Sequence, residues 1–221
     1  MSNQTIYSAL VRSGMTPEGA CAVMGNMMAE SGMKSTNVED RSNIRDDDYT
    51  AKVDNDPSYD FGSDNGHHYG YGLCQWTLPS RKRALLAFAK SSGASIGDEY
   101  TQVQFCVKEL CKDFPGVWAL LVSSHNLYEC TSMFCAVYEN PAVKNTDVRY
   151  GFAQKFFDEF AGQEIQPDSP GSDPSPQNWD WKIALIQFAM QCDGYWGEPD
   201  GMKSQNFFTS LEQYVKDMQL C

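Results

Sequence analysis

Residues 16–32 have the sequence TPEGACAVMGNMMAESG, which carries the start, the apolar face and the end of one helix. Thr16 is a favourable N-cap residue, Pro17 suits the first helical position, and the charge of Glu18 favours a helix N-terminus. Apolar residues then recur with the 3.6-residue period of a helix, namely Ala20, Val23, Met24, Met27 and Met28. Gly32 stands where a left-handed cap would end the helix.

Glu30 shares this apolar face, because it follows Val23 by seven residues and Met27 by three. Apolar surroundings and the helix C-terminus both disfavour a charged carboxyl, so we expect Glu30 to hold a proton near neutral pH. Cleavage of a glycosidic bond needs such a proton donor for the leaving oxygen. Position alone nevertheless favours a solvated glutamate at a frayed helix end.

The sequence outside residues 16–32 predicts a mainly helical domain. Helical patterns cover residues 6–14, 80–90, 98–112, 117–122, 127–138 and 148–160. Residues 33–68 are polar and lack periodicity, which indicates a long loop or a small, poorly ordered sheet lobe. Residues 70–77, GYGLCQWT, are aromatic and punctuated by glycine, as suits a segment lining a binding cleft.

A change of composition divides the chain. Residues 163–178 alternate proline with glycine, serine and aspartate, which predicts a linker. It separates a domain of residues 1–162 from a small helical segment of residues 179–221. That segment carries an Asp-Gly-x-x-Gly turn at residues 193–197, which resembles small peptidoglycan-binding modules. We interpret it as a wall-binding or partial module.

The overall charge excludes some partners. The 221 residues include 29 acidic and 17 basic side chains, a formal net charge of −12, so nucleic acid is an unsuitable partner. No stretch reaches the roughly 20 apolar residues of a membrane-spanning helix, and the N-terminus has no signal-peptide pattern. We therefore expect no membrane insertion and synthesis in the cytoplasm.

Cysteine and histidine spacing gives no sign of a metal site. The eight cysteines fall at helix-core positions without zinc-type C-x-x-C spacing, which favours buried free thiols. Cys106 and Cys111 lie on one predicted helix, and Cys130 and Cys135 lie on another. A disulfide that joins the two helices is an alternative that the sequence leaves open. The adjacent His67 and His68 would point to opposite sides of an extended chain. No metal or other cofactor is predicted.

Several short motifs occur in a characteristic order. Residues 25–32, GNMMAESG, are followed some forty residues later by residues 71–77, YGLCQWT, and then by Ser80-Arg81-Lys82. The pattern ends with residues 138–141, YENP, and Arg149-Tyr150. Together, over about residues 5–161, these motifs resemble the phage tail lysozyme family, which occurs in phage tail proteins and endolysins.

The resemblance implies a lysozyme-like fold of mainly α, α+β class, with a helical lobe and a small β-containing lobe that hold a glycan between them. Glu30 matches the catalytic glutamate of the family, whereas Cys74 departs from the small residue, such as alanine, usual there. The implied activity is that of a muramidase, which cleaves the β-1,4 bond between N-acetylmuramic acid and N-acetylglucosamine in peptidoglycan.

The resemblance also implies a role in phage lysis or infection. The protein would be made in the host cytoplasm and would act on the cell wall, as a free endolysin or as a virion component. Its partner would be the peptidoglycan glycan strand, with phage tail proteins or holin-dependent export as further expectations.

A hydrolase must also position water, and an inverting one needs a second carboxyl about 6.5 to 9.5 Å from the acid. Glu39 and Asp40 rank ahead of Asp48 and Asp60 because they follow the predicted catalytic helix most closely, although a solvated loop charge explains each of the four.

Four residues are candidates for substrate binding. The Gln75 amide can hydrogen-bond an acetamido or hydroxyl group, and the Trp76 indole can stack on a sugar, although a core position explains Trp76 equally well. Tyr71 and Tyr138 are supported mainly by the resemblance.

Three other functions stay open. Glu30-Ser31 and the Gly72-Leu73-x-Gln75 pattern also resemble lytic transglycosylases, which cut the same bond and form 1,6-anhydro products. Cys74, His125 and Asn140 follow one another in the order of a cysteine peptidase or amidase, but residues 127–138 are expected to be helical where such enzymes need strands. The third function is that of an inactive wall-binding virion protein.

Overall fold

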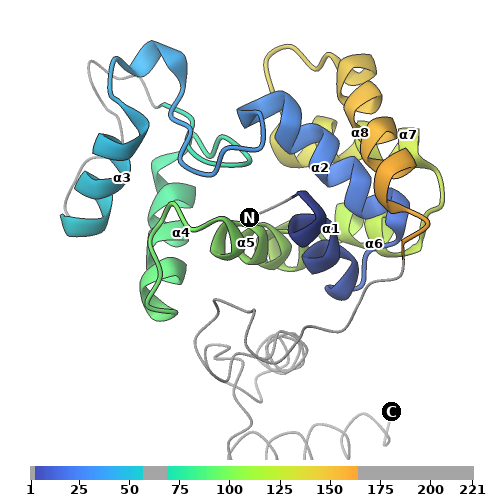
Figure 1. Ribbon diagram of the computed structural model, residues 1–221, viewed down its shortest axis with the longest axis horizontal. Coiled ribbons are helices and arrows are strands. Elements are labelled where there is room, and N and C mark those ends of the chain that lie inside the picture. Colours follow the sequence, from blue (N-terminus) through green and yellow to red (C-terminus); the bar gives the residue numbers. More distant parts are fainter. Residues whose placement is uncertain (1–2, 57–68, 164–221) are drawn as a thin grey trace, which may run out of the picture. The chain divides into compact units, whose positions relative to one another are not determined.

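The computed structural model describes residues 3–56 and 69–163 (Figure 1). They belong to the first of two units, Met1–Pro167, and the second unit is Asp168–Cys221. The predicted linker beyond residue 163 and the segment 179–221 thus lie outside the described residues, as do Asp60, His67 and His68.

The described residues form an all-α fold. Its α-helices are α1 (Asn3–Arg12), α2 (Pro17–Ser31), α3 (Asp46–Asn55), α4 (Pro79–Ser91), α5 (Glu99–Asp113), α6 (Pro115–Ser123), α7 (Leu127–Met133) and α8 (Thr146–Phe160). Two other helical segments are the 3-10 helix η1 (Asp40–Ser42) and the π-helix η2 (Phe134–Glu139).

Helix α2 lies at the centre of the helices α1, α6, α7 and α8, all of which contact it (Figure 1). Its residues from Gly19 to Met27 are all buried, so every face is covered and not only the predicted apolar stripe. The predicted ends are confirmed. The Thr16 side chain accepts a hydrogen bond from the Gly19 amide (3.0 Å), and Gly32 caps the helix with φ of 61°.

Glycine allows α8 to pack very closely against α2. A Cβ atom at Gly25 would lie 2.6 Å from the Ala153 nitrogen and 2.7 Å from the Arg149 carbonyl oxygen, distances that real Cβ atoms do not adopt. The first family-like motif therefore includes the residue that brings α8, and with it Arg149, against α2.

The prediction of a small β-containing lobe, and with it the α+β class, is wrong for the residues that the structure describes. Residues 3–56 and 69–163 contain no strand, and a single antiparallel bridge joins Val38 to Tyr71. Instead of a loop or sheet, residues 46–55 form α3. Its first turn holds Asp46, Asp47 and Asp48, whose charges favour a helix N-terminus, and Tyr49 and Val53 are buried one turn apart.

The other helices are confirmed to within a few residues of their predicted ends, except that one of them continues as a π-helix. Asp98 caps α5 by accepting a hydrogen bond from the Thr101 amide (2.8 Å). The segment predicted as one helix over residues 127–138 is α7 followed by the π-helix η2. None of the described helices is long and apolar enough to cross a membrane.

The described cysteines are free thiols, as predicted. Cys111 is partly buried and the other five are buried, namely Cys21, Cys74, Cys106, Cys130 and Cys135. Cys192 and Cys221 lie outside the described residues.

Candidate active site

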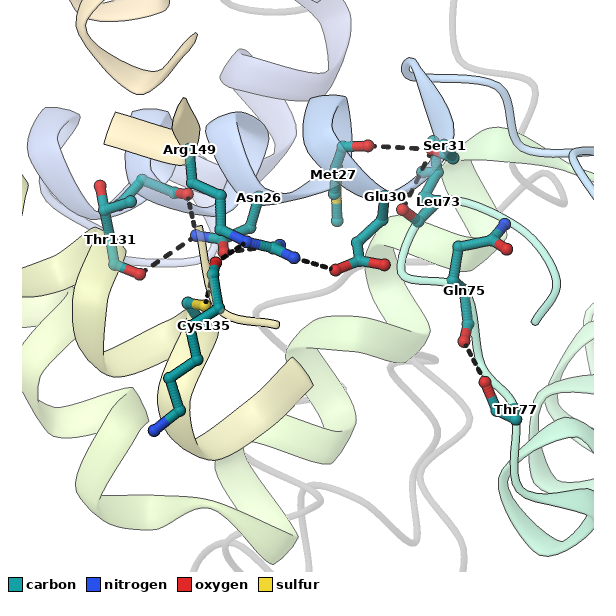
Figure 2. Close-up of polar contacts among 12 residues, drawn as sticks. Asn26, Met27, Glu30, Ser31, Leu73, Gln75, Thr77, Thr131, Cys135 and Arg149 are labelled. Atoms are coloured by element: carbon teal, nitrogen blue, oxygen red, sulfur yellow. Dashed lines mark hydrogen bonds and ion pairs between the residues drawn. The ribbon is translucent and has the colours of Figure 1, made fainter. Parts of the chain in front are cut away.

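Glu30 is the penultimate residue of α2, and its side chain is 17% exposed. Its Oε1 atom lies 2.5 Å from Nη2 of Arg149, which comes from α8 (Figure 2). No described residue makes a hydrogen bond or ion pair with Oε2. One oxygen of the carboxyl is therefore fixed by the protein and the other is left for another partner.

Arg149 is a buried cation held at three points. Its Nη1 donates to Oδ1 of Asn26 (3.1 Å), its Nε donates to the Lys144 carbonyl (2.8 Å), and its Nη2 donates to Glu30. Asn26 is oriented in turn, because its Nδ2 donates to the carbonyls of Ala22 (2.9 Å) and Thr131 (3.3 Å). The sequence argument for Glu30 considered its apolar surroundings and the helix C-terminus, and the structure adds the neighbouring cation Arg149.

The second motif is joined to the end of α2. The Ser31 hydroxyl donates to the carbonyls of Met27 (3.0 Å) and Leu73 (3.1 Å). Gln75 has a positive φ of 46°, a strained conformation for a residue other than glycine. Its Nε2 donates to the carbonyls of Asn37 (3.1 Å) and Gly72 (3.0 Å). In Figure 2, Glu30 lies between Arg149 on one side and the segment with Leu73 and Gln75 on the other.

Three of the predicted substrate-binding residues have buried rings whose polar atoms bond within the protein. Trp76 Nε1 and the Tyr138 hydroxyl both donate to Oε2 of Glu109, at 2.8 and 2.6 Å. The Tyr71 hydroxyl shares a 2.7 Å hydrogen bond with Thr50. These rings present no open face to a sugar in this structure, and Gln75 is the partly exposed member of the predicted set.

The two candidate second carboxylates lie around η1. Glu39 precedes this helix, and its Oε2 accepts a hydrogen bond from the Gly70 amide (3.2 Å), while its own amide donates to the Gly70 carbonyl (2.9 Å). Asp40 begins η1 and is exposed.

Glu109 on α5 is a residue that the sequence analysis did not single out. Besides Trp76 and Tyr138, it binds Arg81 through both oxygens, at 2.8 and 2.7 Å. The Arg81 guanidinium also lies over the Tyr138 ring, 4.7 Å from its centroid. This buried carboxylate therefore ties the second motif to α4 and η2.

Glu139, the last residue of η2, was also missed as a site residue, although it belongs to the YENP motif. Its Oε1 atom is buried without a hydrogen-bond partner. Burial raises the pKa of this carboxyl well above its usual range, and the nearby charge of Glu30 raises it further, against the opposing effects of Arg81 and Arg149. Glu139 thus combines a raised pKa with one buried oxygen that has no hydrogen-bond partner.

The arrangement does not suit a cysteine peptidase. Burial, followed by a hydrogen bond with Cys106, raises the pKa of the Cys74 thiol well above its usual range, so the reactive thiolate is disfavoured. His125 pairs with Glu18 (3.2 Å) in the first turn of α2, whereas Leu73, next to Cys74, contacts the last turn. No group of three or more metal-binding side chains gathers within the described residues.

Comparison with known proteins agrees with the motifs. The family model described as phage tail lysozyme matches residues 2–160, which include Glu30, Arg149, Glu139 and both segments of the paired signature. No curated protein matches the chain significantly. The chain therefore belongs to the phage tail lysozyme family, and it is an enzyme of lysozyme type that acts on peptidoglycan.

Proposed function

We propose that the protein is a muramidase that cleaves the β-1,4 bond between N-acetylmuramic acid and N-acetylglucosamine, with Glu30 as the general acid. The observation that carries this proposal is the half-fixed carboxyl of Glu30. Arg149 holds its Oε1, and its Oε2 has no partner among the described residues.

Arg149 suits this role because a general acid must leave a stable conjugate base. When Glu30 gives its proton to the leaving glycosidic oxygen, the guanidinium stabilises the carboxylate that remains. The negative charge of that carboxylate also favours the oxocarbenium-like transition state on the sugar. The same acid would serve a transglycosylase, so the products distinguish the two reactions.

We assign glycan contact to Gln75, the predicted binding residue that is not buried. Trp76, Tyr71 and Tyr138 support this segment from within the protein, through Glu109 and Thr50. Among the candidates for positioning water, Asp40 is exposed, whereas Glu39 also binds the Gly70 amide. The proposed setting is the wall of a bacterium that a phage infects or lyses.

The test is Glu30→Gln, which keeps an oxygen for Arg149 but cannot donate the carboxyl proton. We expect normal folding and a loss of at least about 10²-fold to 10⁴-fold in the rate of wall clearing, measured by turbidity. Glu159→Gln, an exposed substitution of the same kind on α8, is the matched control and keeps full activity. A folded, fully active Glu30→Gln protein would rule out Glu30 as the acid.

A further inference from the structure

Asn26 is a fully buried amide inside α2, a place where asparagine is unfavourable. Its side chain competes for backbone hydrogen bonds in a helix, and a buried amide costs stability unless its polar atoms are paired. Its Nδ2 donates to the carbonyls of Ala22 (2.9 Å), one turn earlier on α2, and of Thr131 (3.3 Å) on α7. These two bonds orient the amide so that its Oδ1 accepts the hydrogen bond from Nη1 of Arg149 (3.1 Å).

Asn26 and Glu30 lie one turn apart on the same face of α2, and Arg149 binds both of them (Figure 2). Nη1 of the guanidinium donates to Asn26 and Nη2 donates to Glu30, while Nε donates to the Lys144 carbonyl (2.8 Å). Because the guanidinium is planar, the bonds to Nη1 and Nε fix the direction in which Nη2 points. The amide of Asn26 therefore helps to set where the Glu30 carboxyl is held.

The partners of Arg149 differ in charge. The Asn26 amide and the Lys144 carbonyl are neutral, so Glu30 is the one anionic partner of Arg149 among the residues that the structure describes. A carboxylate at position 26 would also accept a hydrogen bond from Nη1, but it would neutralise the guanidinium. The neutral amide orients Arg149 and leaves its positive charge for Glu30.

We infer that Asn26 is a positioning residue, which aims the Arg149 guanidinium at Glu30 without neutralising it. Arg149 can then stabilise the carboxylate that forms when Glu30 gives up its proton. This inference rests on the proposed role of Glu30 as the general acid. Since Asn26 is buried, it acts through Arg149 and not on the substrate. Two other titratable groups act on the pair, namely Glu139 and Cys135 of η2, and substitution of Asn26 leaves both in place.

The pH profile of wall clearing tests the charge of this contact. Asn26→Asp keeps an oxygen for Arg149 but adds a competing negative charge. Glu30 should then keep its proton to higher pH, so we expect the alkaline limb of the profile to move up by about one unit. Asn55→Asp is the matched control, because Asn55 makes the same bond to the carbonyl four residues earlier (Ala51, 2.7 Å) at the exposed end of α3. A lower rate at every pH without a moved limb would show a merely structural role and overturn the inference.

A double-mutant cycle tests whether Asn26 acts through Arg149. Asn26→Leu keeps a branched side chain but has no acceptor for Nη1, and it should lower the rate of wall clearing by about tenfold as Glu30 is misplaced. In an Arg149→Met background the same substitution should cost less than about twofold, because the contact that it removes is already lost. Equal losses in the two backgrounds would contradict the inference.

A third measurement does not depend on the folding of the variants at position 26. The side-chain nitrogens of arginine are observed by NMR in the wild type, and the signals of Arg149 are those that disappear in Arg149→Lys. Because different partners hold Nη1 and Nη2, these atoms should give two separate signals. A single averaged signal, as from a freely rotating guanidinium, would refute the positioning role. A fully active Glu30→Gln protein would instead refute the proposed function, so the two failures are distinguishable.

Discussion

At the scale of single residues, Arg149 connects the proposed acid to the fold. Its planar guanidinium reaches Asn26, Lys144 and Glu30 in three directions at once. A lysine has the same charge but only one nitrogen at the end of a flexible chain, so it cannot keep all three contacts. The geometry of the guanidinium therefore matters as much as its charge.

Arg149→Lys should lower both activity and stability. Misplacement of Glu30 is expected to reduce the rate of wall clearing by about 10²-fold, since catalysis depends on the position of the acid. The unpaired oxygens of Asn26 and Lys144 should lower the free energy of unfolding, measured in urea, by about 1–3 kcal/mol. Lys155→Ala, an exposed change on α8, is the control. Wild-type activity in Arg149→Lys would show that the charge alone suffices.

The sequence drew attention to Glu30 as a carboxyl in an apolar stripe, and the resemblance to the family then selected it as the candidate acid. The same signal marks Glu109, which lies three and four residues after the buried Cys106 and Phe105. Its partners Trp76, Arg81 and Tyr138 come from distant parts of the chain, so their contacts could not be predicted from local spacing. The burial of these aromatic side chains likewise follows from the tertiary packing.

At the scale of elements, the contact between α2 and α8 decides the position of the site. Gly25 allows the two helices to approach until the backbone of α8 occupies the space of a Cβ atom. The glycine and Glu30 are five residues apart on α2, and Arg149 spans the distance between them. Helix packing and acid geometry are therefore coupled.

Gly25→Ala should push α8 away from α2. We expect a loss of about 1–3 kcal/mol in the free energy of unfolding, from overpacking, together with reduced wall clearing as Arg149 moves from Glu30. Gly151→Ala on α8 is a matched control, because a Cβ atom there would have no neighbour within 4 Å. It should be neutral or stabilising by up to about 1 kcal/mol. Equal stability of the two variants would contradict the close packing described here.

Helices with a strong apolar period were predicted correctly. The prediction failed for α3, whose first turn is acidic, and for η2, which is wound as a π-helix. Helix α3 was missed because three consecutive aspartates resemble a polar loop, although a helix N-terminus favours their charges. The π-helix η2 could not be predicted, because residues 134–139 carry an ordinary helical pattern. Glu139, the last residue of this segment, was overlooked as well.

At the scale of the whole molecule, the raised pKa of Glu139 should make the free energy of unfolding depend on pH. Below the ordinary glutamate pKa of about 4.3, the folded and unfolded chains both hold the Glu139 proton. Above it the unfolded chain releases the proton, while the folded chain keeps it because its pKa is raised. Unfolding becomes more favourable as the pH rises from there towards the folded pKa, by up to about 1.4 kcal/mol per unit.

Glu139→Gln removes this dependence, because glutamine does not titrate. Its melting temperature relative to the wild type should therefore be higher at pH 7 than at pH 4, as measured by circular dichroism. For Glu159→Gln the difference from the wild type should stay nearly constant. If Glu139→Gln shows no such rise, Glu139 is ionised in the folded protein.

Mass spectrometry of digested peptidoglycan tests the central claim most directly. The wild type should release fragments with reducing N-acetylmuramic acid ends, and Glu30→Gln should release almost none under the same conditions. Ends of the 1,6-anhydro type would show a transglycosylase, newly freed amines would show a peptidase or amidase, and an absence of soluble fragments would show a wall-binding protein. Any of these three results from the wild type would contradict the proposed muramidase.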